Sequence, residues 1–161
     1  MRICSFPPIA DKKCKLPILG TMPGKDSLKY NEYYAHPRNT FWKLMFDVLG
    51  TPYSNDYKSK QKLLLDNNIA LWDVLATCYR EGSLDSDILE EEPHDIKGFI
   101  DSHPKVSHLL FNGKSSYQFF KRYGKDIELP PILLPSTSPA YVLSYEKKRE
   151  GWTIIKNLLE Q

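Results

Sequence analysis

Residues 19–42, LGTMPGKDSLKYNEYYAHPRNTFW, decide the fold of this chain. They begin inside a short apolar run, residues 16–21, which predicts a buried strand. About twenty loop-like residues with two prolines and a glycine follow, and apolar residues recur at helical spacing from Phe41 onward. The segment is therefore predicted to hold a strand, a long loop and the start of a helix.

The same alternation of strands and helices continues to the end of the chain. Further apolar runs predict strands at residues 69–75, 106–111 and 132–134. Amphipathic patterns predict helices at residues 40–49, 59–67, 95–102, 115–123 and 145–159. Four short strands separated by helices indicate one α/β domain over residues 1–161, a three-layer α/β/α sandwich around a four-stranded parallel sheet.

Composition limits the compartment and the chemistry. Of the 161 residues, 41% are hydrophobic and 26% are charged, and no apolar run reaches the roughly 20 residues that span a bilayer. The N-terminus lacks the apolar core of a signal peptide, so we expect a cytoplasmic protein. The three cysteines and four histidines form no CxxC, HExxH or HxH pattern, and an iron–sulfur cluster usually takes about four thiolates. We therefore expect neither a metal site nor a cofactor.

The charges are unevenly distributed along the chain. The net charge is only +2, but residues 85–95 contain six acidic residues and no Lys or Arg, which leaves the remainder basic. We expect this acidic loop to face away from a polyanionic partner bound by the basic remainder, although a merely solvated surface explains the charges nearly as well. Charge alone does not identify the partner.

Distinctive residues follow each predicted strand. The sequences at the four exits are GTMPG at 20–24, WDVLATC at 72–78, FNGK at 111–114 and LPSTSPAY at 134–141. Ligands of parallel α/β sheets bind beyond the carboxyl ends of the strands. We therefore expect the four exits to converge on one cleft.

At these exits the chain resembles the uracil-DNA glycosylase superfamily. GTMPG stands where the mismatch-specific branch has GINPG, residues 34–42 resemble its FAHPxNxFW motif, and residues 134–139 are similar to the HPSPLS or NPSGLS loop. With ALWDV and FNGK, these motifs look closest to the hypoxanthine-DNA (deoxyinosine) glycosylase branch. The resemblance implies a monofunctional glycosylase of base excision repair. We expect it to act as a monomer on DNA that contains a deaminated base, chiefly hypoxanthine.

Two positions depart from the superfamily. Met22 stands where relatives carry the Asp or Asn that handles the attacking water, and Leu134 stands where a His or Asn assists the departing base. Neither a thioether nor an isobutyl group can orient water or donate to a developing anion. Another residue must do this chemistry, or the chain binds DNA without cutting it.

Asn39 is the candidate for the chemistry that Met22 and Leu134 cannot perform. Hydrolysis of an N-glycosidic bond passes through a cation-like sugar and an increasingly anionic base, so the site needs a positioned water and donors that face the base. The amide of Asn39, at the end of the loop that contains Met22, can accept from a water and donate to it. The resemblance also implies that Asn39 is catalytic in this branch. The alternative is that Asn39 only caps the following helix.

Further residues are predicted to bind the extruded nucleotide. Tyr34 aligns with the aromatic residue on which relatives stack the base, and the alternative is a core tyrosine. Asn112 can present a donor and an acceptor to a purine edge, although Asn-Gly is also a common turn dipeptide. Asp73 matches a strand position from which some relatives contact the base, with a helix cap as an equal alternative. The predicted substrate site is completed by Gly20, Thr21, Ser136 and Ser138, the two serines facing phosphates.

Residues outside this pocket are expected to meet the DNA. Relatives hold an apolar wedge about where Ser138 stands, so the wedge here is either smaller or comes from elsewhere, for example from Tyr141. Basic residues after the third and fourth exits face the DNA backbone or are simply solvated helix ends: Lys114, Lys147, Lys148 and Arg149.

Three other interpretations remain open at this stage. The first is a uracil or mismatch-specific glycosylase of the same fold, and the second is a DNA-binding relative without catalysis. The third is a nucleotide-binding α/β protein that holds phosphate with GTMPG. This last one is the weakest, because the segment lacks GxGxxG and GxxxxGK[ST].

Overall fold

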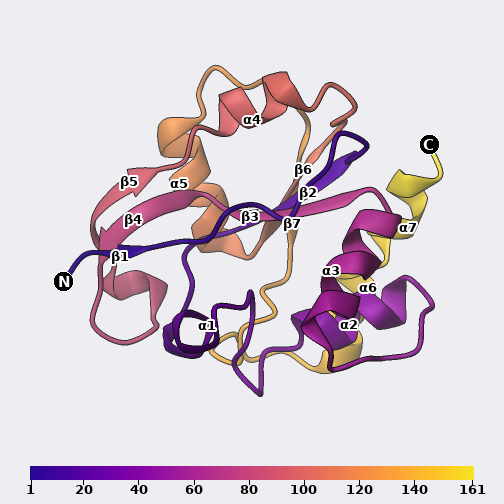
Figure 1. The fold of residues 1–161 in the computed structure, drawn as a ribbon, viewed down its shortest axis with the longest axis horizontal. Coiled ribbons are helices and arrows are strands. Elements are labelled where there is room, and N and C mark those ends of the chain that lie inside the picture. The colour runs from indigo at the N-terminus through magenta and orange to yellow at the C-terminus, as the bar shows by residue number, and fades with distance from the viewer.

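A four-stranded parallel sheet forms the centre of the computed structural model, which describes all 161 residues (Figure 1). Its strands, in spatial order, are β3 (Ile69–Asp73), β2 (Leu16–Gly20), β6 (Leu109–Asn112) and β7 (Pro131–Leu134). Every neighbouring pair is parallel. The predicted sheet is confirmed, with strand bounds within three residues of those expected from the apolar runs.

Helices cover both faces of this sheet. One face carries α2 (Phe41–Val48), α3 (Tyr57–Asp66), α6 (Tyr145–Trp152) and α7 (Ile154–Leu159). The other face carries α4 (Ile96–Ser102) and α5 (Lys114–Tyr123). Figure 1 shows α4 on the side of the sheet opposite α2, α3, α6 and α7. The three-layer α/β/α sandwich is therefore confirmed.

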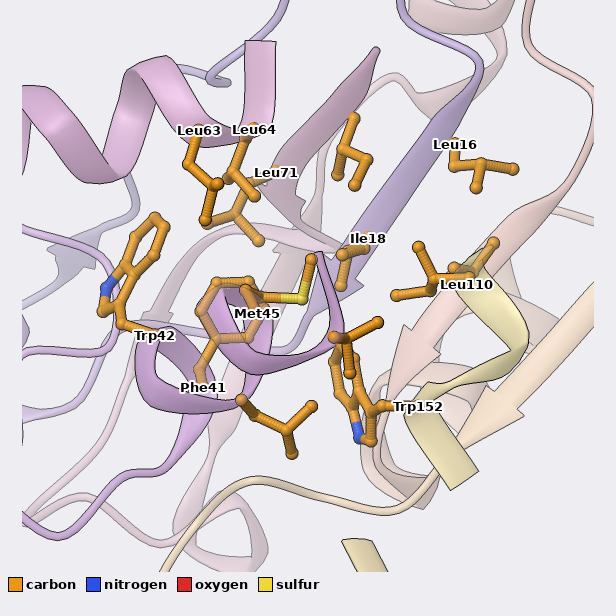
Figure 2. Close-up of a cluster of buried hydrophobic side chains, with 14 of the residues drawn as sticks. Leu16, Ile18, Phe41, Trp42, Met45, Leu63, Leu64, Leu71, Leu110 and Trp152 are labelled. Carbon is orange, nitrogen blue, oxygen red and sulfur yellow. The ribbon is translucent and has the colours of Figure 1, made fainter. Parts of the chain in front are cut away.

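Alternation along the strands divides the core into two clusters. Successive side chains of a strand point to opposite faces of the sheet. Leu16, Ile18 and Leu110 therefore pack with α2, α3 and α6. Leu19, Leu109 and Phe111 point to the other face. Figure 2 shows the first cluster, in which Ile18 and Leu110 meet side chains of α2 and α6. The second cluster joins the other strand residues to α4 and α5. Burial on both faces explains why these strands are nearly continuous apolar runs.

A second, smaller sheet was not predicted. The apolar run at 69–75 was expected to be one strand, but the chain bends at Val74 and starts β4 (Leu75–Tyr79). This strand pairs in antiparallel fashion with β1 (Ile3–Cys4) and β5 (Leu89–Pro93). The acidic segment expected to be a loop therefore contains a strand and a short 3₁₀ helix, η1 (Asp85–Asp87).

Two helices also differ from the expectation. The long loop after β2 contains α1 (Lys25–Tyr30), which ends at Asn31 in the left-handed conformation with φ of 55°. The single helix expected at 145–159 is divided into α6 and α7 at Thr153. No helix of the structure has the length and apolar character needed to cross a membrane.

The register of the sheet brings all four strand exits to one edge. Gly20 pairs with Asp73, and Asn112 pairs with Leu134, so the central strands end side by side. The long segment from β2 to α2 leaves the sheet at this edge, and the 134–144 segment returns from it to α6. Residues from distant parts of the sequence therefore lie close together there.

Candidate active site

A cavity of about 580 Å³ lies at this edge of the sheet. Residues of all four strand exits line it, which confirms the expected convergence. The predicted catalytic residue Asn39 lines this cavity, and so does every residue predicted to bind substrate: Gly20, Thr21, Tyr34, Asp73, Asn112, Ser136 and Ser138. The volume falls in the range of about 300–1,000 Å³ that is usual for small-ligand sites.

Gly20 ends β2 under two polar side chains. A Cβ atom placed on Gly20 would lie 2.6 Å from Asp73 Oδ1 and 2.6 Å from the Tyr34 hydroxyl oxygen. Only a residue without a side chain leaves room for both groups. Glycine here therefore allows a carboxyl and a phenol to approach the floor of the cavity together.

Tyr34 connects the cavity with the core. Its backbone has a positive φ of 55°, and its ring stacks on Phe41 with a centroid distance of 4.4 Å. The hydroxyl is buried and has no hydrogen-bond partner. Burial and the neighbouring Asp73 charge raise the pKa of the Tyr34 phenol above its ordinary value, so the phenol stays neutral. Tyr34 thus packs against the core and also lines the cavity, and stacking of a base on it stays a prediction.

Asp73 is a buried carboxyl at the end of β3. It is 3% exposed, and its Oδ2 atom has no hydrogen-bond partner. Burial raises the pKa of Asp73 to about 7, the Asp85 carboxylate adds to the rise, and the Arg80 guanidinium opposes it. The alternative role as a helix cap is wrong, because Asp73 is followed by β4 rather than by a helix.

The acidic segment approaches the cavity instead of facing away from it. Asp85 lines the cavity and lies 3.6 Å from Arg80 Nη1, whose side chain is completely buried. Arg80 also donates to the Pro23 carbonyl, and the Ser83 hydroxyl accepts from the backbone N–H of Lys25 at 2.9 Å. These contacts hold the segment against the loop after β2, so the expectation of an outward-facing acidic loop is wrong for Asp85.

Asn112 is held by Thr137. Its Nδ2 donates to Thr137 Oγ1 at 2.9 Å, and its Oδ1 accepts from the Thr137 backbone N–H at 3.0 Å. The pair is buried and joins the exits of β6 and β7. The following Gly113 has a positive φ of 94°, which agrees with the turn alternative. One N–H and one oxygen lone pair of the Asn112 amide remain for a ligand.

Asn39 accepts a hydrogen bond at the start of α2, which agrees with the capping alternative, although the N-cap residue itself is Thr40 and its side chain makes no cap bond. Asn39 Oδ1 accepts from the backbone N–H of Phe41 at 3.0 Å, at the start of α2. This bond identifies the oxygen of the amide and fixes its orientation. The side chain is partly exposed to the cavity, so the second lone pair of Oδ1 and the amide NH₂ are available there. Capping and a contact with water are therefore compatible.

The two apolar replacements differ in position. Met22 lines the cavity and is 8% exposed, whereas Leu134 is 3% exposed and packs in the core between the sheet and α2. The cavity thus has a thioether where relatives were expected to show a carboxylate or an amide. No group of three or more His, Cys, Asp or Glu side chains has the arrangement of a metal site.

The loop after β7 is organised by its own hydroxyls. Ser136 Oγ accepts from the Ser138 N–H at 3.2 Å, and Ser138 Oγ accepts from the Ala140 N–H at 3.1 Å. Lys148 was expected to face the DNA backbone, but it is buried and its Nζ donates to the Ser138 carbonyl at 3.1 Å. That expectation is wrong, and Lys148 instead supports the loop.

The positions of Thr137, Arg80 and Asp85 in the site were not predicted. Thr137 lies inside the quoted LPSTSPAY motif, but nothing in the sequence pairs it with Asn112. Arg80 and Asp85 carry no local signal, because Arg80 contacts Pro23, 57 residues away, and Asp85 lines the cavity beside the distant loop after β2.

Comparison with known proteins gives a consistent result. A model of the uracil DNA glycosylase superfamily matches residues 7–159. A protein of Methanosarcina barkeri named hypoxanthine DNA glycosylase is 33% identical over 156 residues, covering 94% of this chain and 96% of that protein. One of the same name from Methanosarcina acetivorans is 32% identical over 151 residues, covering 93% and 95%.

A solved structure agrees with these matches. The solution NMR structure of a Methanosarcina acetivorans protein, described as a candidate uracil DNA glycosylase, has a TM-score of 0.87 and 31% identity, with full coverage of both chains. The family match spans nearly the whole chain, and the fold and the cavity at the strand exits agree with it. The chain therefore belongs to the uracil DNA glycosylase superfamily.

Proposed function

We propose that this protein is a monofunctional DNA glycosylase that hydrolyses the N-glycosidic bond of deoxyinosine and releases hypoxanthine. The observation that carries the proposal is the cavity, which gathers the four strand exits around buried polar atoms that have no partner in the protein. The two Methanosarcina relatives named hypoxanthine DNA glycosylase support this choice of base. A base can reach buried polar atoms at the floor of this cavity only if the nucleotide is flipped out of the duplex.

Asn39 holds the attacking water in this proposal. The bond from Phe41 N–H fixes Oδ1, and its second lone pair accepts a hydrogen bond from the water. The water oxygen forms a bond to the sugar C1′ as the C1′–N9 bond breaks. The electron pair of the C1′–N9 bond leaves with the base, and the water proton is released to solvent or to the base. No lysine nucleophile takes part, so the enzyme leaves an abasic site and an intact strand.

The other lining residues hold the extruded nucleotide. The Tyr34 ring contributes a stacking surface, which is worth roughly 1–3 kcal/mol per base. Asn112, oriented by Thr137, uses its free N–H and lone pair toward the purine edge. The backbone and hydroxyls of Gly20, Thr21, Ser136 and Ser138 surround the sugar and the flanking phosphates.

Excision of uracil is the second candidate, because the similar solved structure was described as a candidate uracil DNA glycosylase. Hypoxanthine and uracil share a ring carbonyl beside a ring N–H, so one site can accept both. Binding without cutting is the third, because Met22 and Leu134 offer no polar group.

A substrate series separates these candidates. Duplex oligonucleotides with one deoxyinosine, deoxyuridine or deoxyxanthosine, and a normal duplex, are incubated with the protein, and each product is examined with and without alkali. We expect an alkali-dependent break at deoxyinosine and an intact normal duplex. Cutting at deoxyuridine alone would identify a uracil glycosylase, and binding without any cutting would identify a non-catalytic relative. A break without alkali would contradict the monofunctional mechanism.

A further inference from the structure

Two buried polar atoms in the floor of the cavity have no partner in the protein. They are Asp73 Oδ2 and the Tyr34 hydroxyl oxygen, and both residues line the cavity above Gly20. An unpaired buried polar group destabilises the folded protein, so such atoms are expected to find their partner in a ligand. The floor therefore calls for a ligand edge that both donates and accepts hydrogen bonds.

The charged and titratable groups around Asp73 come from three segments. Asp85 comes from η1, Arg80 follows β4, and Tyr33 and Tyr34 precede α2. The cluster thus contains two carboxyls and one permanent cation. Both phenols are neutral because burial raises their pKa values.

The cation stabilises Asp85 more than Asp73. Burial raises the pKa of Asp85 as well, but hydrogen bonding to Thr21 and Ser115 and the ion pair with Arg80 at 3.6 Å oppose that rise. Asp73 is more deeply buried and has one oxygen without any donor. When only one of the two carboxyls is protonated, the proton therefore resides on Asp73.

We infer that Asp73 binds the extruded base as a neutral carboxylic acid, donating its O–H to the ring carbonyl and accepting from the adjacent ring N–H. Asp85 is a positioning residue whose negative charge keeps the proton on Asp73, and Arg80 holds η1 against the cavity through Asp85 and the Pro23 carbonyl. This inference rests on the proposed excision of a deaminated base. It assigns the carboxyl a catalytic contact with the base edge where a carbonyl lies next to an N–H.

The protonation state matters for the reaction. Negative charge collects on the base as the C1′–N9 bond breaks, so a neutral donor at the carbonyl lowers the barrier, whereas a carboxylate would repel the leaving base. The same acid can also pair with adenine, so Asp73 assists departure and does not by itself select the base. Since the acid form is active, excision is fast below the pKa of Asp73, about 7, and declines as the pH rises above it.

The protonation state can be measured without any activity. The carboxyl carbons of ¹³C-labelled aspartate are followed by NMR across pH, and the Asp73 signal is identified by its absence in Asp73→Asn. We expect a midpoint near 7, against an ordinary value near 3.8. A midpoint below about 5 would overturn the inference, because Asp73 would then be ionised at neutral pH.

Single-turnover rates on the deoxyinosine duplex test the catalytic contact. Above the midpoint the wild-type rate should fall about tenfold per pH unit. Asp73→Asn keeps a neutral donor and an acceptor, so it should retain activity and lose this decline. Asp73→Leu has neither group and should lose about 10²–10³-fold at low pH. An unchanged profile in Asp73→Asn, or a wild-type rate that rises with pH, contradicts the inference.

A matched pair of variants tests the positioning role of Asp85. Asp85→Asn removes the neighbouring negative charge and should move the Asp73 midpoint and the rate profile to lower pH. Asp87→Asn, an exposed residue of the same η1, should leave both unchanged. If the Asp73 titration midpoint were the same in Asp85→Asn and Asp87→Asn, Asp85 would have no positioning role.

Binding of the same duplexes is measured in parallel, so that two kinds of failure can be told apart. Binding of deoxyinosine DNA without cleavage contradicts the proposed glycosylase. In that case tighter binding at low pH that disappears in Asp73→Asn still supports the neutral acid, and pH-independent binding overturns it.

Discussion

Asn39 shows how one carboxamide can serve both the fold and the reaction. Its oxygen accepts from Phe41 N–H and still faces the cavity. Asn39→Ala should reduce the excision rate by about 10²–10⁴-fold, because the water loses its acceptor. It should also lower the free energy of unfolding by about 1 kcal/mol, because the first turn of α2 loses a cap. Single-turnover kinetics and urea unfolding measure the two effects separately.

A serine at the same position is the control for the capping effect. Asn39→Ser retains a side-chain oxygen that can accept from the backbone two residues later, so stability should return to near the wild-type value. The hydroxyl is shorter than the amide, so the excision rate should stay low. Full activity in Asn39→Ser or in Asn39→Ala would assign Asn39 to capping alone.

The sequence supplies some residues of the site and not others. Gly20, Tyr34, Asn39 and Asn112 could be proposed because each belongs to a motif that begins or ends next to a strand exit. Arg80 and Asp85 could not, since the Arg80 contact with Pro23 spans 57 residues and leaves no local pattern. The role of the Thr137 hydroxyl could not be predicted either, because its partner Asn112 lies 25 residues away.

Burial of a strand determined whether the sequence could predict it. The strands β2, β3 and β6 are buried on both faces, and all four strands of the central sheet, with the partly exposed edge strand β7, form apolar runs that the sequence displays directly. The strand β5, LEEEP, is mostly exposed and acidic, and β1 has only two residues, so neither carries a period-2 apolar pattern. The second sheet therefore depends on pairing with β4, which local sequence does not reveal.

The helix α6 connects the core to the loop after β7. Trp152 is fully buried, its ring lies 5.7 Å from that of Phe41, and its Nε1 donates to the Pro135 carbonyl at 2.8 Å. Trp152→Ala should therefore cost about 3–5 kcal/mol of unfolding free energy. It should also reduce excision in the fraction that stays folded, since the 134–144 loop loses a contact. Urea unfolding and single-turnover rates at low temperature test both effects.

A neighbouring residue provides the control for Trp152. Ile154, the first residue of α7, is 36% exposed, so Ile154→Ala should change stability much less and leave excision unchanged. Trp152→Phe keeps much of the packing but removes the bond to Pro135. If it excised the base as fast as the wild type, the Trp152–Pro135 contact would have no role in the site.

For the molecule as a whole, the surface beside the cavity favours a DNA backbone. Arg38 lines both the cavity and a second, more open groove that also contains Tyr141, Val142 and Lys147. Val142 is 93% exposed and Tyr141 is 48% exposed, so apolar tips and cations lie together at this edge. Such a surface suits a polyanion with stacked bases.

Salt dependence of DNA binding tests this surface. Arg38→Ala should weaken binding to duplexes with and without deoxyinosine by a similar factor, because a phosphate contact carries no sequence information. It should also reduce the slope of log K against log salt concentration by roughly 1. Lys125→Ala is the matched control, since Lys125 is an exposed cation in the α5–β7 connection at the opposite end of the strands. An equal change of slope in both variants would mean that DNA binding is spread over the surface instead of centred on the cavity.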